Sequence, residues 1–210
     1  MGNVIEFRNI TKYFPGVKAL DDISFTANGG DVAALLGENG AGKSTLLKVL
    51  NGDYQQTSGE YLVNGEPCHF NSPREAVAAG IGVIYQERQI MLELTVGENI
   101  FLGRLPTGFM GRIKMREVHS RAQAIIDEFG LDMKSTDKVK DLSVAYQQMV
   151  EIMKAYSREN LKMIAFDEPT ASLSDSEIDS LFRIIRKLKA EGKVIIYVSH
   201  RMAEIRPSVD

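Results

Sequence analysis

The chain has 210 residues, of which 44% are hydrophobic and 25% are charged, the balance of an ordinary globular protein. Its 25 Lys and Arg residues and 28 Asp and Glu residues give a net charge of −3, which is not typical of a dedicated nucleic-acid-binding protein. The single cysteine, Cys68, excludes an intrachain disulfide. The apolar runs are far shorter than the ~20 residues of a membrane span, and we expect no signal peptide. We therefore expect a cytosolic protein that reaches a membrane only through a partner.

Strand-like segments dominate the first third of the chain. Residues 4–8, 23–27 and 60–64 are short β-type runs bordered by turn residues. Residues 32–36 are continuously apolar, which predicts a strand buried on both faces of a sheet. A helix is expected directly afterwards, over residues 43–50.

Three later helices have recognisable starts. Ser72, Thr95 and Ser174 are each followed three positions later by a glutamate, the pattern of a capping box. After Ser174 the apolar residues recur with helical spacing, at Ile178, Leu181, Phe182, Ile185 and Leu188. A further helix is expected over residues 116–129.

Apolar strands alternate with helices in the second half of the chain. Residues 163–166 and 194–198 are strands of this kind, and their alternation with helices favours parallel pairing in an α/β core. An α/β sheet usually continues beyond a strand and helix such as residues 194–205. We therefore expect the chain to be truncated at its C-terminus.

Residues 37–44 fit the phosphate-binding pattern G-x-x-x-x-G-K-[ST]. Glycines let backbone N–H groups curl around the β- and γ-phosphates without Cβ clashes, and the following helix points its dipole at the anion. Lys43 supplies an ammonium for the phosphates and Ser44 a hydroxyl for Mg²⁺. The sequence predicts an ATP site made of Gly37, Glu38, Asn39, Gly40, Ala41, Gly42, Lys43, Ser44 and Thr45.

Two adjacent carboxylates follow the apolar strand at residues 163–166. Asp167, at the end of that strand, is suited to hold the shell of Mg²⁺. Glu168 is suited to orient or deprotonate the water that attacks the terminal phosphate. Alone, such a pair is common on surfaces, but beside a phosphate loop it indicates nucleotide hydrolysis.

Five motifs in this order resemble the nucleotide-binding domain of ABC ATPases, and the resemblance covers essentially the whole chain. They are the loop at residues 37–44, Gln86 after a strand, Leu142 and Ser143 at a helix start, Asp167 with Glu168, and His200 after a strand. Longer stretches resemble the first half of the tandem ATPases of bacterial monosaccharide importers of the arabinose, galactose, ribose and xylose type. These stretches are residues 14–20, 37–46, 85–87, 94–100, 148–152 and 198–202.

The resemblance implies an α/β fold and a particular domain organisation. It implies a P-loop NTPase core with a mostly parallel sheet, at about residues 1–86 and 160–210. It adds an N-terminal antiparallel β subdomain, and a helical lobe at about residues 87–159. All 210 residues would form one ABC-type ATP-binding domain.

The resemblance also assigns roles to single residues. Phe14 matches the aromatic residue that stacks on adenine, with Tyr13 as the neighbouring candidate and a plain core aromatic as the alternative. Gln86 matches the residue that contacts Mg²⁺ and the attacking water and links the site to the helical lobe. His200 matches the histidine that contacts the γ-phosphate. Ser143 matches the signature residue that caps the ATP held by an opposite domain, or else it is an ordinary helix N-cap.

Two places depart from the family pattern. The signature, usually Leu-Ser-Gly-Gly-Gln, here continues after Ser143 with Val144, Ala145 and Tyr146. Side chains at positions where backbone must approach a phosphate are expected to hinder that approach. The second departure lies in residues 171–174, where the usual final aspartate is Ser174.

The leading functional hypothesis is an ATPase subunit, using ATP and Mg²⁺, that drives sugar import from the cytoplasmic side of the cell membrane. Its implied partners are membrane-spanning permease subunits, a second ATP-binding domain and, indirectly, a periplasmic or extracellular sugar-binding protein, with no nucleic acid. The alternatives are an ABC ATPase acting on ribosomes or DNA, and a binding-only regulatory domain. The first alternative would show long charged linkers or a coiled-coil insert, and the second would lack the catalytic residues.

Overall fold

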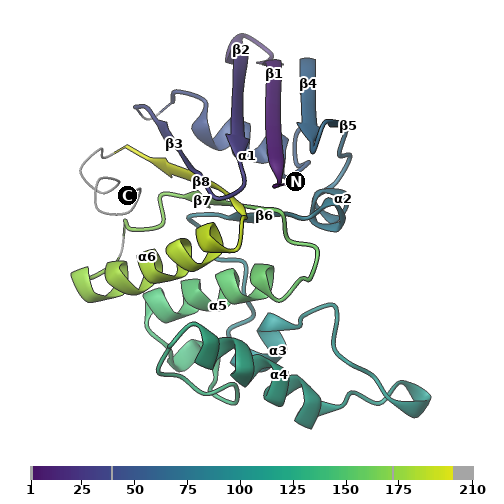
Figure 1. Cartoon of the computed structure of the whole chain (residues 1–210), viewed down its shortest axis with the longest axis vertical. Coiled ribbons are helices and arrows are strands. Elements are labelled where there is room, and N and C mark those ends of the chain that lie inside the picture. Colours follow the sequence, from purple (N-terminus) through teal and green to yellow (C-terminus); the bar gives the residue numbers. More distant parts are fainter. Residues whose placement is uncertain (1, 39, 172, 201–210) are drawn as a thin grey trace. The chain divides into compact units, whose positions relative to one another are not determined.

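The structure, a computed structural model, describes residues 2–38, 40–171 and 173–200 (Figure 1). These residues form two compact units. The first contains residues 2–38, 40–86, 160–169 and 185–200, and the second contains residues 87–159, 170–171 and 173–184. In the described residues, no helix is long and apolar enough to cross a membrane.

An antiparallel sheet occupies the N-terminal part of the first unit. Its strand order is β2-β1-β4-β5, and the strands are β1 (Val4–Phe14), β2 (Val17–Asn28), β4 (Ser58–Val63) and β5 (Glu66–Cys68). β1 and β2 are longer than the runs that the sequence pattern indicates. Irregular pairing between Phe7 and Tyr13 explains the difference, because it interrupts the period-two alternation that a strand needs to be recognised.

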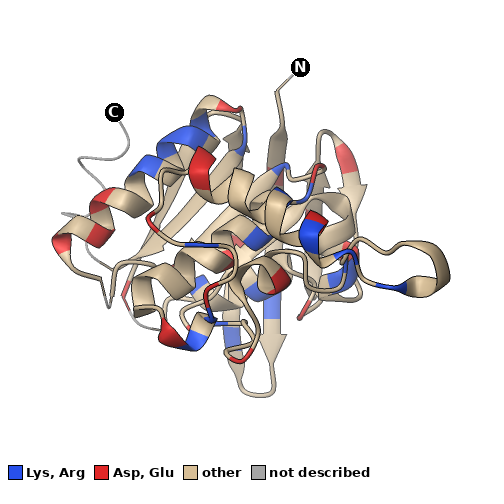
Figure 2. Ribbon diagram, turned by 90° about the horizontal axis from the view of Figure 1, so that it is seen from below, with Lys and Arg blue, Asp and Glu red and all other residues tan. Residues whose placement is uncertain are grey.

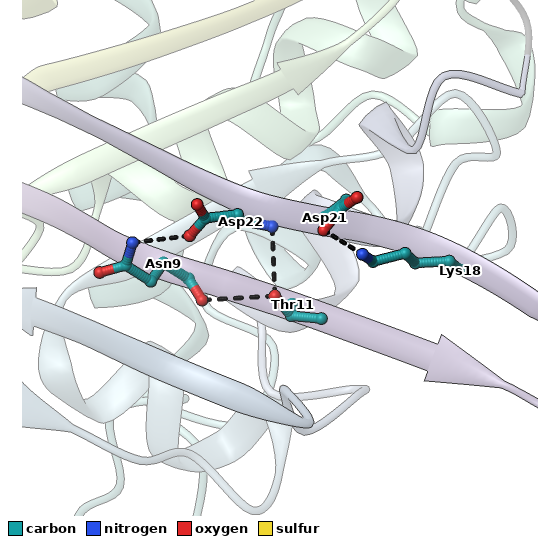
Figure 3. A network of polar contacts seen from close by, with 5 residues as sticks. All are labelled: Asn9, Thr11, Lys18, Asp21 and Asp22. Atoms are coloured by element: carbon teal, nitrogen blue, oxygen red, sulfur yellow. Dashed lines mark hydrogen bonds and ion pairs between the residues drawn. The ribbon is translucent and has the colours of Figure 1, made fainter.

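Polar side chains support this irregular part of the β1–β2 ribbon (Figure 3). Asn9 and Asp22 lie on opposite strands and both have a φ of 54°, a left-handed conformation that asparagine and aspartate tolerate better than most residues. The Asn9 amide donates a hydrogen bond to Asp22 Oδ1 at 2.6 Å, and the Asp22 N–H donates to Thr11 Oγ1 at 3.1 Å. The register shifts on either side of Ile10 offset each other, and after a third shift between Lys12 and Tyr13 the strands stay paired up to Phe14 and Val17.

A parallel sheet forms the other part of the first unit, which confirms the predicted pairing. Its order is β3-β8-β7-β6, with β3 (Val32–Leu36), β8 (Val194–Ser199), β7 (Met163–Asp167) and β6 (Ile81–Ile84). β7 and β8 are buried along their whole length. The expectation that β3 is buried on both faces is wrong. Among the described residues β3 is an edge strand, and Ala34 and Leu36 are exposed.

Helices α1 (Lys43–Leu50) and α2 (Pro73–Ala79) belong to the first unit. The apolar face of α1 packs into the same buried cluster as the inward side chains of β1, β7 and β8. α2 begins where the sequence predicts, because the Ser72 side chain accepts a hydrogen bond from the Glu75 N–H. The packing of α1 against the strands holds its first residue, Lys43, at a defined place at the carboxyl end of β3.

The second unit is helical. It contains α3 (Val96–Ile100), α4 (Met115–Glu128), α5 (Val144–Tyr156) and the 3-10 turns η1 (Phe109–Gly111) and η2 (Val139–Asp141). The division between the units falls within α6 (Asp175–Ala190). The predicted capping box at Thr95 is present in both directions with Glu98, and the helix predicted over residues 116–129 is α4. α6 begins directly after Ser174, as predicted.

Candidate nucleotide-binding site

The phosphate loop connects β3 to α1. Gly40 and Gly42 both have a φ near +88°, a conformation that a residue with a side chain rarely adopts. A Cβ atom on Gly42 would lie 2.4 Å from the carbonyl oxygen of Ala19 on β2, so this glycine is also required for close packing. Gly42 is the N-cap of α1. Asn39, another predicted loop residue, lies outside the described residues.

The cationic and hydroxyl groups of the loop face specific oxygen atoms. The Lys43 ammonium donates to the carbonyl oxygens of Gly37 at 2.5 Å and Glu38 at 2.9 Å, so its side chain lies along the loop. The Ser44 hydroxyl donates to Asp167 Oδ2 over 3.4 Å. The fold thereby joins the two motifs, 123 positions apart in the sequence, in one site.

Asp167 ends β7 and is only 9% exposed. Burial raises the pKa of this carboxyl group, the hydrogen bond from Ser44 lowers it, and the adjacent Glu168 carboxylate raises it further. A buried carboxylate with these neighbours benefits strongly from a cation placed beside it.

Glu168, the next residue, has a strained backbone. Its φ is 47°, and its N–H donates to the carbonyl oxygen of Val198 on β8 at 3.0 Å. A non-glycine residue in this conformation costs about 1–3 kcal/mol, and such strain gathers at functional sites. The turn brings Glu168 Oε1 to 3.1 Å from Nδ1 of His200, directly after β8.

A cavity of about 710 Å³ lies over these groups, entirely within the first unit. Its lining includes seven of the predicted site residues: Phe14, Gly40, Gly42, Lys43, Ser44, Thr45 and Gln86. Asp167 and Glu168 complete the set of predicted residues in its wall. Phe14, rather than its neighbour Tyr13, lines the cavity, and Tyr13 is 49% exposed.

Three further residues line the cavity although no role was predicted for them. These are Val17, Lys18 and Ala19, at the start of β2 just across the turn from Phe14. The Lys18 ammonium forms an ion pair with Asp21 (Figure 3), and the pair is exposed. The sequence signal for these residues was their place in the stretch of residues 14–20 that resembles the importer ATPases.

Ser143 belongs to the second unit, where it is the N-cap of α5. Its hydroxyl oxygen accepts a hydrogen bond from the Tyr146 N–H at 3.3 Å, and its O–H donates one to Glu177 Oε1 at 3.1 Å. The other oxygen of Glu177 accepts from the Ser174 N–H at 2.9 Å and from its hydroxyl at 2.8 Å. The Glu177 carboxylate thus connects Ser143, just before the altered signature residues, to Ser174, the altered residue of the second segment. Ser172, in the second of these segments, lies outside the described residues.

The three side chains after Ser143 are not equally placed. Val144 is 44% exposed, and Tyr146 is half-buried. Ala145 is only 1% exposed, so its methyl group points into the second unit. The expectation that all three side chains hinder the close approach of a phosphate is therefore wrong for Ala145, because helix periodicity turns that position inward.

The fold and the site define a P-loop nucleotide-binding protein, since a glycine-rich loop, a lysine, a hydroxyl and paired carboxylates meet at the carboxyl end of a parallel sheet. The family model described as ABC transporter matches residues 20–171. The chain therefore belongs to the ABC transporter family.

Curated relatives match nearly all of this chain. It is 53% identical over 201 residues to the arabinose import ATP-binding protein AraG of Yersinia pestis, covering 96% of the chain and 38% of the relative. The corresponding protein of Vibrio parahaemolyticus is also 53% identical, with 96% and 39% covered. The chain thus spans about two fifths of the length of these relatives.

Solved structures show the same fold. A nucleotide-free ATP-binding cassette from an ABC transporter aligns with a TM-score of 0.83 at 28% identity, covering 99% of this chain and 85% of that one. The ADP conformation of an ATP-binding cassette aligns with a TM-score of 0.84 at 28% identity, covering 100% and 86%. The predicted α/β P-loop fold is confirmed.

Proposed function

We propose that this chain binds and hydrolyses ATP to energise the import of a sugar by an ABC transporter. The observation that carries the proposal is that one and the same cavity is lined by Phe14, Lys43, Ser44, Asp167 and Glu168. These residues are suited to bind a base, phosphates, a cation and an attacking water. The names of the relatives, arabinose import ATP-binding proteins, support the proposal that the imported substrate is a sugar.

The phosphates of ATP would occupy the loop of residues 37–45. The Lys43 ammonium would exchange its two carbonyl contacts for phosphate oxygens, which are stronger, charged acceptors. The N–H groups at the start of α1 would bind the same oxygens. Phe14, which lines the same cavity, would stack on the adenine.

The donor set fits Mg²⁺. Ser44 Oγ and Asp167 Oδ2 lie 3.4 Å apart, both are hard oxygen donors, and Gln86 adds an amide oxygen to the same cavity. Bound there, the ion would neutralise charge that develops on the β- and γ-phosphates. The burial of Asp167 supports this assignment, because a cation would compensate the charge that burial disfavours.

Hydrolysis would depend on Glu168 and His200. Glu168 is the carboxylate next to the cation-binding residue, and it would accept a proton from water aligned with the γ-phosphate. The His200 ring, 3.1 Å from that carboxylate, would hold it in place and reach the γ-phosphate. Gln86 is the last residue of the first unit before the chain enters the second unit. It would contact Mg²⁺ and the attacking water and so link the site to the second unit.

The whole transporter would supply the missing parts. A second ATP-binding domain, membrane-spanning permease subunits and an external sugar-binding protein are proposed partners, with this chain at the cytoplasmic side of the membrane. Ser143 would contact the ATP of the second domain. Against the ribosome or DNA alternative, acidic and basic residues are interspersed along the ribbon (Figure 2).

Two measurements test the proposal. Calorimetric titration of the chain with MgATP should give saturable binding, weakened by about 2 kcal/mol or more in Lys43→Ala, which loses a charge-assisted contact. Equal titrations for both proteins would overturn the site. Purification of the full-length protein from membranes should recover permease subunits, whereas recovery with ribosomes or DNA would overturn the transport role.

A further inference from the structure

The Phe14 ring, which lines the cavity, packs against a second aromatic ring, that of Tyr54. The Tyr54 ring meets the Phe14 ring edge-on, with centroids 5.2 Å apart and planes at 74°. Such edge-to-face pairs are favourable because the positive edge of one ring meets the negative face of the other. Tyr54 is half-buried and is not among the residues that line the cavity, so it supports Phe14 from outside the site.

Tyr54 is held in place by the helix that opens at the phosphate loop. Its N–H donates to the carbonyl oxygen of Lys48 in the last turn of α1 at 3.1 Å. The Lys48 ammonium lies 5.3 Å from the centre of the Tyr54 ring. The Lys12 ammonium lies 5.0 Å from the Phe14 ring and 5.9 Å from the Tyr54 ring, so it binds both.

The chain after Tyr54 is also tied to the strand that carries Phe14. The Tyr13 N–H donates to Thr57 Oγ1 at 3.0 Å, and the Thr57 N–H donates to the carbonyl oxygen of Thr11 at 2.7 Å. The segment from Tyr54 to Thr57 thus connects the end of α1 to the end of β1. Helix α1 therefore has Lys43 at its start, and Tyr54, which contacts the Phe14 ring, just after its end.

We propose that Tyr54 is a positioning residue for the base-binding aromatic Phe14, setting its ring at a fixed distance from the phosphate loop through α1. This inference rests on the proposed binding of ATP in the cavity. Its consequence is selective: Tyr54 contributes to the affinity for a nucleotide with a base, and not to the affinity for phosphates alone.

The test compares two ligands, MgATP and magnesium tripolyphosphate, by calorimetric titration of the 210-residue chain. Tyr54→Leu removes the ring. Tyr54→Met also removes it, but its longer, flexible apolar side chain fills more of the space that the ring leaves. Tyr54→Phe keeps the ring, and Tyr13→Leu removes the neighbouring exposed ring as a matched control. Phe14→Ala, alone and combined with Tyr54→Leu, shows whether the two residues act together.

We expect Tyr54→Leu and Tyr54→Met to weaken MgATP binding about three- to tenfold and to leave tripolyphosphate binding unchanged. Tyr54→Phe and Tyr13→Leu should bind both ligands as the unmodified chain does. Phe14→Ala should lower the affinity for MgATP at least about fivefold, and adding Tyr54→Leu to it should lower the affinity no further.

Several results would overturn the inference. Unchanged MgATP binding in the Tyr54 variants, or equal losses for both ligands, would mean that Tyr54 does not act on base binding. An additional loss on top of Phe14→Ala would mean that it acts by another route. If Phe14→Ala itself changes nothing, the base contact is wrong, whereas Lys43→Ala separately tests the phosphate site of the proposed function.

Discussion

Oε1 of Glu168 lies 3.1 Å from Nδ1 of His200, and the two residues follow neighbouring strands, β7 and β8. The parallel register pairs Asp167 with Val198, so Glu168 and His200 leave the sheet at the same edge. Glu168 adopts a left-handed backbone conformation at this point, with a φ of 47°. The pair therefore owes its geometry to sheet pairing rather than to local sequence.

Replacement of Glu168 by glutamine should separate binding from chemistry. Glu168→Gln keeps the shape of the side chain and its contact with His200 but removes the proton acceptor. We expect MgATP to bind as before and turnover to fall at least about 100-fold, the scale of a lost general base. The measurement is single-turnover hydrolysis by the full-length protein. Turnover near the unmodified rate would place the base elsewhere.

The altered signature should make the two ATP sites of the assembled transporter unequal. Val144 is exposed and Tyr146 is half-buried. In the proposed transporter these side chains would stand where backbone must approach a phosphate bound by the second domain. In the full-length protein, Lys43→Ala should abolish hydrolysis, and Ser143→Arg should leave a large part of it. Ser143→Arg proving as damaging as Lys43→Ala would show that both sites matter equally.

Glu151 should make stability depend on pH. This residue of α5 is 6% exposed and accepts a hydrogen bond from the Gln89 N–H, and its second oxygen has no hydrogen-bond partner among the residues that the structure describes. Burial raises its pKa from the ordinary 4.5 to about 7, against the opposing effects of that hydrogen bond and of Lys154 and Arg88. Between pH 4.5 and about pH 7 the folded chain therefore binds one more proton at Glu151 than the unfolded chain does. As the pH rises through this range, Glu151 lowers the free energy of unfolding.

Glu151→Gln removes the titrating group and keeps an oxygen for the Gln89 N–H. We expect the free energy of unfolding of the variant, relative to the unmodified chain, to rise by about 3 kcal/mol from pH 4.5 to pH 8. Urea unfolding at several pH values provides the measurement. Comparison across pH cancels the constant cost of burying the new amide group. A pH-independent difference would contradict the prediction.

The paired bulges of β1 and β2 can be tested by a charge swap (Figure 3). Asn9→Asp places a carboxylate against Asp22 and should lower the free energy of unfolding by about 1 kcal/mol, since both residues are exposed. Adding Asp22→Asn restores a donor and an acceptor and should recover most of that loss. Asp21→Asn, at the adjacent position, is the control. A double variant as unstable as Asn9→Asp would exclude the hydrogen bond as the cause.

Local sequence was sufficient wherever a structural feature depends on neighbouring residues. The helix starts at Ser72 and Thr95 follow from side chains that bond N–H groups three positions away. The phosphate loop follows in the same way, because its glycines permit the backbone conformation and α1 begins at the next residue. For the same reason the strands of the parallel sheet could be located from their apolar runs.

Tertiary structure decided the features that depend on residues far apart in the chain. Leu36 is exposed although its strand is apolar, because β3 is an edge strand of the described sheet. Ala145 is buried, although its place in the signature predicted an exposed side chain, because the helical periodicity of α5 turns it inward. The bulges at Asn9 and Asp22 require both strands at once, so a period-two pattern in either strand alone did not reveal them. The choice of Phe14 over Tyr13 for the cavity, and the support of its ring by Tyr54, depend on packing between β1 and the end of α1. Sequence therefore determined which chemical groups this protein carries, and long-range packing determined which of them meet.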